Sequence, residues 1–326
     1  ENVGTATING NVYGGSALGN TNVDASHEPT ANSKTNVSLL KGTITGNVFG
    51  GGLGKKEVEA KDAVGENPED PSYIPAVEHE DGIAAIVGGD VYVLLDGAKL
   101  VSTYTTGANP APITGQIFGA NNLNGTPKGH VTVHVKRTVD SDKPTATLRD
   151  NRTTYDVAAV YGGGNQADYI PTKATGTDAE KEEAFAEVII EGCDLTSIQN
   201  VYGGGNAAAV PATDVTILGS YIIDYVFGGG NGKGVDNPGA NIGTYNNGTT
   251  EYGTGKAVTK LVGGHIHYVF GGSDTKGNVR GGTSLTMPET SGYAGKDFCT
   301  VRDVKQIYGA GNQADQDGNV TLILDS

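Results

Sequence analysis

An aromatic residue followed by glycine recurs eight times along this chain of 326 residues. In every copy Val or Ile precedes the aromatic residue, Gly follows it, and the next position is Gly or Ala. A phosphate-binding loop would occur once and lead into a helix, so eight copies indicate a repeating architecture. The aromatic residues of these kernels are Tyr13, Phe49, Phe118, Tyr161, Tyr202, Phe227, Phe270 and Tyr308.

A second motif accompanies the kernels. It is a short run rich in β-branched residues with Gly or Asp nearby, which is typical of a strand. In three copies the first Val of the run lies 12 residues before the aromatic residue, and the shortest full period is 25 residues. The eight runs begin at Asn36, Asp90, His130, Ala186, Asp214, Ala257, Thr283 and Asn319.

Short strands at this period predict an all-β, single-stranded, right-handed parallel β-helix of about eight rungs with long loop insertions. A leucine-rich repeat would show a ladder of Leu, and a propeller blade needs more strands than 25 residues supply. We treat 1–326 as one repeat domain. Because it begins and ends inside a repeat, we expect it to be a segment of a longer protein.

Four segments interrupt the repeats and predict surface loops: 55–86, 173–187, 232–256 and 287–303. One of them contains the only convincing helical pattern, Thr175–Glu187, which either Thr177 or Asp178 could cap. If the loops project from one flank of the repeat, they form a binding face.

The glycines should allow a tight corner with positive φ after each strand, and residues of a recurring corner should stack. The aromatic residues therefore predict one ladder. The equal numbers of Tyr and Phe favour a buried or rim position, while Tyr13, Tyr161, Tyr202 and Tyr308 leave open an exposed platform for sugar rings. A second ladder of side-chain amides is predicted from the Asn that closes five copies, namely Asn121, Asn165, Asn206, Asn231 and Asn312.

His265 and His267 are two residues apart in a predicted strand and should share a face. They are either half of a metal site or outward-facing histidines, and without a third ligand nearby we predict no metal site here. Asn312–Asn319 and Gly271–Asn278 are rich in oxygen ligands but lack EF-hand spacing, so structural calcium stays open. No other cofactor is indicated.

Charge and composition exclude some classes of function. The net charge of −15 and the absence of a basic stripe argue against a nucleic-acid partner, and no apolar run is long enough to span a membrane. The chain contains no G-H-G, no adjacent Asp pair and no G-x-S-x-G elbow, which disfavours glycan cleavage and serine hydrolysis. Cys193 and Cys299 are far apart in sequence, so two buried thiols are favoured over a single bridge.

The V-Y-G-G-G-N repeats at 160–165 and 201–206, with N-V-T-L at 319–322, resemble large Gly-rich, adhesin-like repeat proteins of gut Bacteroidetes. The resemblance implies a secreted or cell-surface β-helix in contact with neighbouring repeats of its own chain. We therefore predict a non-enzymatic adhesin or structural module that binds a glycan or a surface protein through flank loops. The alternative is a carbohydrate-active enzyme with a pectin-lyase-like fold, either a polysaccharide lyase or a glycoside hydrolase, and a self-assembling fibre is a third hypothesis.

Overall fold

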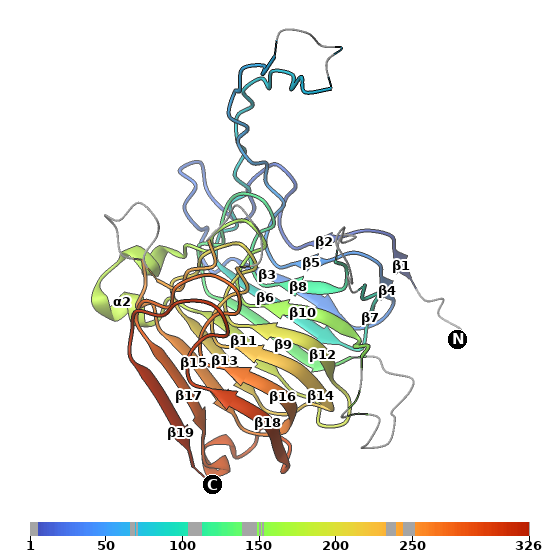
Figure 1. Ribbon diagram of the computed structural model, residues 1–326, viewed down its shortest axis with the longest axis vertical. Helices are drawn as coiled ribbons and strands as arrows, with labels where there is room; N and C mark the ends of the chain where they lie inside the picture. The colour runs from blue at the N-terminus through green and yellow to red at the C-terminus, as the bar shows by residue number, and fades with distance from the viewer. Residues whose placement is uncertain are drawn as a thin grey trace.

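The protein is all-β with almost no helix, and two long parallel sheets run side by side through it (Figure 1). The computed structural model describes residues 6–65, 69, 71–103, 113–138, 149, 151, 153–232, 239–243 and 252–325. In each large sheet eight parallel strands stack in chain order, which is consistent with a parallel β-helix.

All eight β-rich runs predicted from the sequence form the first sheet, so that prediction is confirmed. Its strands are β3 (Lys34–Leu39), β6 (Asp90–Asp96), β9 (Val131–Arg137), β11 (Ala186–Ile190), β13 (Thr213–Ile217), β15 (Ala257–Leu261), β17 (Thr283–Met287) and β19 (Val320–Leu324).

Each of the eight aromatic kernels ends a strand of the second sheet. These strands are β2 (Val12–Tyr13), β5 (Val48–Phe49), β8 (Gln116–Phe118), β10 (Val157–Tyr161), β12 (Ser197–Tyr202), β14 (Ile222–Phe227), β16 (Gly264–Phe270) and β18 (Arg302–Tyr308). We use the term rung for a strand of the first sheet together with the strand of the second sheet that follows it in the chain. A short third sheet pairs β1 (Thr7–Ile8), β4 (Thr43–Ile44) and β7 (Lys99–Leu100).

The two large sheets enclose an aliphatic core. In β13, for example, Thr213, Val215 and Ile217 are buried while the residues between them are half-buried, as expected when one face of a strand is covered. The second sheet departs from strict alternation. Both Ile198 and Val201 of β12 reach the core, so the two residues between them face outward.

The kernel glycines are required for close approach between rungs. A Cβ at Gly203 would collide with the carbonyl oxygen of Gly228 in the next rung, and Gly162 stands in the same relation to Gly203. The expected positive φ is wrong for this corner, because the described positive-φ glycines lie elsewhere in the chain, for example Gly54 and Gly243. Space, rather than backbone conformation, dictates glycine here.

The insertion at 55–86 forms a projecting arm (Figure 1). Its two sides, Lys55–Val64 and Ile74–Ile83, pair antiparallel at every third residue. Residues 66–68 and 70 of this insertion lie outside the described residues.

The other insertions keep little regular structure. The predicted helix is shorter than Thr175–Glu187: after a 3-10 turn η1 (Thr172–Thr175), the helix α2 spans only Asp178–Glu182, capped by Thr177. It ends there because Ala186 already begins β11. Most of 232–256 lies outside the described residues, and 287–303 carries a short 3-10 turn η2 (Thr290–Tyr293).

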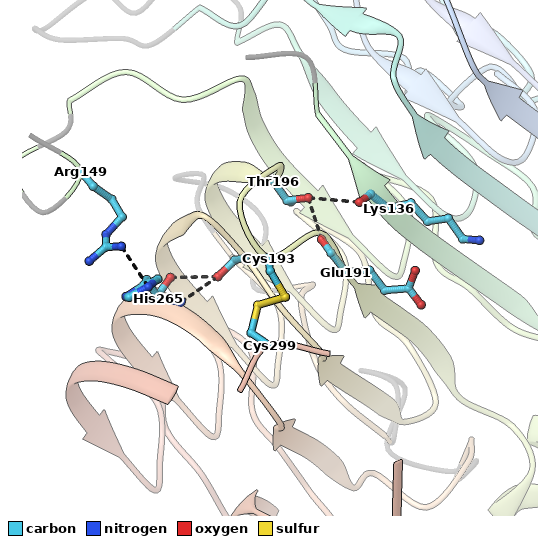
Figure 2. The surroundings of a disulfide bond; sticks show 8 residues. Lys136, Arg149, Glu191, Cys193, Thr196, His265 and Cys299 are labelled. Carbon is cyan, nitrogen blue, oxygen red and sulfur yellow. Dashed lines mark hydrogen bonds between the residues drawn. A yellow bond between two sulfur atoms is a disulfide. The ribbon is translucent and has the colours of Figure 1, made fainter. Parts of the chain in front are cut away.

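Cys193 and Cys299 form a disulfide, so the expectation of two free thiols is wrong (Figure 2). Their Cα atoms are 5.3 Å apart although their sequence separation is 106. The insertion at 287–303 brings Cys299 back beside an earlier corner, where its N–H donates to the carbonyl of Leu218 at 2.9 Å. The hydrogen bond joins this insertion to the corner that follows β13, and the disulfide joins it to the corner that follows β11, where Cys193 lies.

Candidate functional site

The eight kernel aromatics form one continuous stack on the outer face of the second sheet. Neighbouring ring centroids are 4.7–5.0 Å apart and the ring planes differ by 4–10°. Val201 points into the aliphatic core and Tyr202 points to the opposite face, where the rings form a separate cluster. The stack is buried along its middle, whereas Tyr13 is half-buried and Tyr308 is 45% exposed.

A ladder of side-chain amides accompanies the rings. Asn165 donates to Asn122 at 2.9 Å, Asn206 donates to Asn165 at 2.8 Å, and Asn231 donates to Asn206 at 2.7 Å, each from Nδ2 to Oδ1. Asn165 and Asn206 therefore each donate to the amide of the preceding rung and accept from the amide of the next one.

The prediction that Asn121 belongs to the amide ladder is wrong. Asn121 binds the carbonyl oxygens of Ala85 and Asn124 instead, and Asn122 occupies the ladder position. The reason is register: the ladder position lies four residues after the aromatic residue, and Asn121 lies three after Phe118. Counting from the aromatic residue would have found Asn122.

At one ladder position a carboxylate replaces the amide. This residue is Asp274, which lies four residues after Phe270. Its Oδ1 accepts from Asn312 Nδ2 at 2.9 Å. A carboxylate has no proton to pass on, and Asn231 Oδ1 in the preceding rung is buried without a donor among the described residues. Asp274 therefore interrupts the chain of amide hydrogen bonds.

Hydrogen bonds connect the aromatic stack to the amide ladder. Two of them each join a tyrosine hydroxyl to a ladder side chain that lies two rungs further along the chain. Asn231 Nδ2 donates to Tyr161 Oη at 3.2 Å, and Tyr202 donates to Asp274 Oδ2 at 3.3 Å. Burial raises the pKa of both phenols, so both keep their proton at neutral pH. Of the four tyrosines predicted as binding residues, Tyr161 and Tyr202 come together here, and Tyr13 and Tyr308 lie at the two ends of the stack.

A groove of about 330 Å³ opens beside these residues. Small side chains explain it: Ala159 pairs with Gln116 on one side and with Asn200 on the other, so a methyl group stands where both neighbours carry an amide. Ala158 precedes it in β10 and also lines the groove. The lining residues used below are Tyr161, Gln199, Asn200, Tyr202, Tyr225, Asn231, Asp274 and Asn312.

The groove can form many hydrogen bonds with an uncharged ligand. Amide side chains both donate and accept, and tyrosine adds an amphipathic ring edge. Tyr225 stacks on Tyr268 at 5.0 Å and limits the groove on the side away from Ala159. The Tyr225 side chain escaped the sequence analysis because it lies two residues before the kernel aromatic Phe227, at a position that varies between rungs.

His265 and His267 do not act together. His267 Nδ1 lies 2.9 Å from Asp224 Oδ1, whereas His265 Nδ1 lies 3.1 Å from Asp303 Oδ2. His265 Nε2 also contacts Arg149 at 2.9 Å and lines a cavity of about 250 Å³ beside the disulfide (Figure 2). Among the described residues, no three His, Cys, Asp or Glu side chains gather closely enough to hold a metal ion.

Asp168 is a buried carboxyl group with a raised pKa. Burial raises its pKa to about 6, although the N–H of Ala209 donates to Oδ1 at 2.7 Å and acts in the opposite direction. The residue lines a separate cavity of about 380 Å³ with Asn124, Thr126 and Gln166. No other acidic residue of the described chain lines this cavity.

Comparison of the chain with protein-family models, with curated proteins and with solved structures finds no match. Within the described residues, no helix has the length and apolar character needed to cross a membrane.

Proposed function

We propose that the chain is a right-handed, single-stranded parallel β-helix that serves as a non-enzymatic glycan-binding module of a secreted or cell-surface protein. The alternation of strands between the two sheets supports the helix, as does a third line of parallel bridges that joins Val210, Ile242, Val279 and Gln316. The right hand follows the general preference of parallel crossovers.

The groove beside the aromatic stack carries this proposal. Sugars are recognised through hydroxyl groups that donate and accept, and this groove offers several amide side chains with Tyr225 at its border. Its lining comes largely from strands and ladder residues rather than from insertions. The binding face therefore differs from the flank loops expected from the sequence.

The disulfide supports an extracytoplasmic location. Disulfides form and persist in oxidising compartments and are rare where thiols are kept reduced. The bond between Cys193 and Cys299 is therefore in accord with a secreted or surface-exposed protein. A bacterial adhesin remains the specific role we favour, with host or bacterial surface glycans as ligands.

Filling the groove tests the proposal. Ala159→Leu places a larger side chain at the groove, and Ala60→Leu makes the same change at an exposed position of the arm. A glycan array followed by titration calorimetry on the whole chain should show binding by wild type and by Ala60→Leu. Ala159→Leu should reduce the affinity at least tenfold. Equal binding by both variants, or no glycan bound by wild type, would refute the proposal.

A glycan-cleaving enzyme is the second candidate, and Asp168 favours it. A carboxyl group with a pKa of about 6 can act as a general acid near neutral pH. Glycosidases place a second carboxylate opposite the first, and Asp168 has no such companion among the described lining residues. Release of reducing ends or unsaturated sugars that Asp168→Asn abolishes would establish the enzyme instead.

A further inference from the structure

The interruption of the amide ladder at Asp274 points to the kind of glycan that the groove accepts. We infer that Asp274 determines specificity in the groove and selects neutral glycans over acidic ones. This inference rests on the proposed glycan-binding function of the same groove.

For the fold alone, asparagine would be the better residue at this position. An Asn at 274 could accept from Asn312 and also donate to Asn231, as the amides of the earlier rungs do. The carboxylate does only the first, and Asn231 Oδ1 stays buried without a donor among the described residues. An unsatisfied buried acceptor destabilises a protein, so the carboxylate is costly to the ladder.

The carboxylate remains accessible for a ligand. Asp274 is half-buried and lines the groove. Its two oxygens offer about four acceptor directions. Asn312 Nδ2 uses one at 2.9 Å, and Tyr202 Oη uses a second at the longer distance of 3.3 Å. A hydroxyl group in the groove can donate to the remaining directions with the added strength of a charged acceptor.

Asp274 is also the only charged residue among the described lining of the groove. A uronate or sulfate group would bring a second negative charge beside it, and no Lys, Arg or His of the described lining could balance the two. The net charge of −15 acts in the same direction at longer range. A neutral sugar meets no such repulsion.

A pair of opposite substitutions separates the role in binding from the role in the fold. Asp274→Asn removes the charge without changing shape and lets the ladder continue. Asn165→Asp creates the same kind of interruption at an equivalent ladder position that does not line the groove. The probes for titration calorimetry on the whole chain are cellohexaose and maltohexaose as neutral ligands and hexagalacturonate as the acidic one.

We expect wild type to bind at least one neutral hexasaccharide at least tenfold more tightly than hexagalacturonate. Asp274→Asn should lose at least tenfold in that neutral affinity and most of the preference over the acidic ligand, while its melting temperature rises by about 2–4 °C. Asn165→Asp should melt lower and keep its affinity within about twofold, because it weakens the ladder away from the groove.

The failures are distinguishable. If wild type binds hexagalacturonate as tightly as the neutral ligands, or if Asp274→Asn binds as wild type does, the specificity role is refuted while the glycan-binding function stands. If wild type binds none of the three ligands and no glycan on an array, the proposed function fails and the inference fails with it.

Discussion

The middle and the C-terminal end of the stack are built from the same motif but differ sharply in burial. Phe118 is 0% exposed and Tyr308 is 45% exposed. The same holds in the first sheet, where Ile217 is fully buried and Leu324, in the same row of the sheet, is 58% exposed. The difference follows from the neighbours of each ring, because Phe118 stacks on a ring on either side and Tyr308 stacks on one ring only.

The largest effect should come from a matched pair of ring deletions. Phe118→Ala removes a ring stacked on both faces and should reduce the free energy of unfolding by about 3–5 kcal/mol. Tyr308→Ala removes a ring stacked on one face and should reduce it by less than about 1 kcal/mol. Urea denaturation followed by circular dichroism measures both. Equal losses would show that the end is as well packed as the middle.

Loss of the disulfide should have the next largest effect, because the bond connects the insertion before β18 to a middle rung. Because the cysteines are 106 positions apart in sequence, Cys193→Ser with Cys299→Ser should cost about 2–4 kcal/mol. Hydrogen exchange should accelerate most in 287–303 and β18 and least in β8 and β10. The control is reduced wild type, which should match the double variant, and uniform acceleration would contradict a local tether.

A pH-dependent effect should distinguish two equivalent aspartates. Asp168 and Asp315 both lie seven residues after their kernel aromatic, but Asp315 is exposed. The pKa of Asp168 is raised to about 6, so its ionisation destabilises the fold as pH rises from about 4 to about 6, by about 2–3 kcal/mol in total.

Asp168→Asn should therefore stabilise the protein by about 2 kcal/mol at pH 7 and have little effect at pH 4. Asn keeps an oxygen for the N–H of Ala209. Thermal denaturation between pH 4 and pH 8 is the measurement, and Asp315→Asn, the same change at the exposed equivalent position, is the control. A gain at pH 7 no larger than the gain at pH 4 would refute the assignment.

The smallest effect is expected outside the stack. Thr177 and Glu180 form a capping box on α2, whose residues are all outside the buried core. Thr177→Ala should destabilise this helix by about 1 kcal/mol, visible as faster amide exchange in Asp178–Glu182. The global melting temperature should stay within about 1 °C, and a larger drop would mean that the helix supports the rungs.

The sequence predicts those features that repeat. All eight first-sheet strands and all eight kernel strands follow from the spacing of β-rich runs and aromatic residues, because each rung imposes its register on the next. The stack and most of the amide ladder follow for the same reason. Asn121 was misassigned by one position, which shows how strictly the ladder depends on distance from the aromatic residue.

The features that do not repeat could not be predicted in this way. The disulfide depends on the path of the insertion that carries Cys299. The groove depends on small residues, Ala158 and Ala159, in rows where other rungs carry larger side chains. The interruption at Asp274 becomes significant only when its neighbour Asn231 is seen to lack a donor among the described residues.

The stack of kernel aromatics also affects the near-ultraviolet spectrum of the protein. The chain has no Trp, so its near-ultraviolet absorption comes mainly from 15 Tyr and 6 Phe. Tyr161 and Tyr202 lie 4.7 Å apart with planes 6° from parallel, close enough for their transition dipoles to couple. Their excitations are therefore shared between rings, and near-ultraviolet circular dichroism reports directly on whether adjacent rungs are in register.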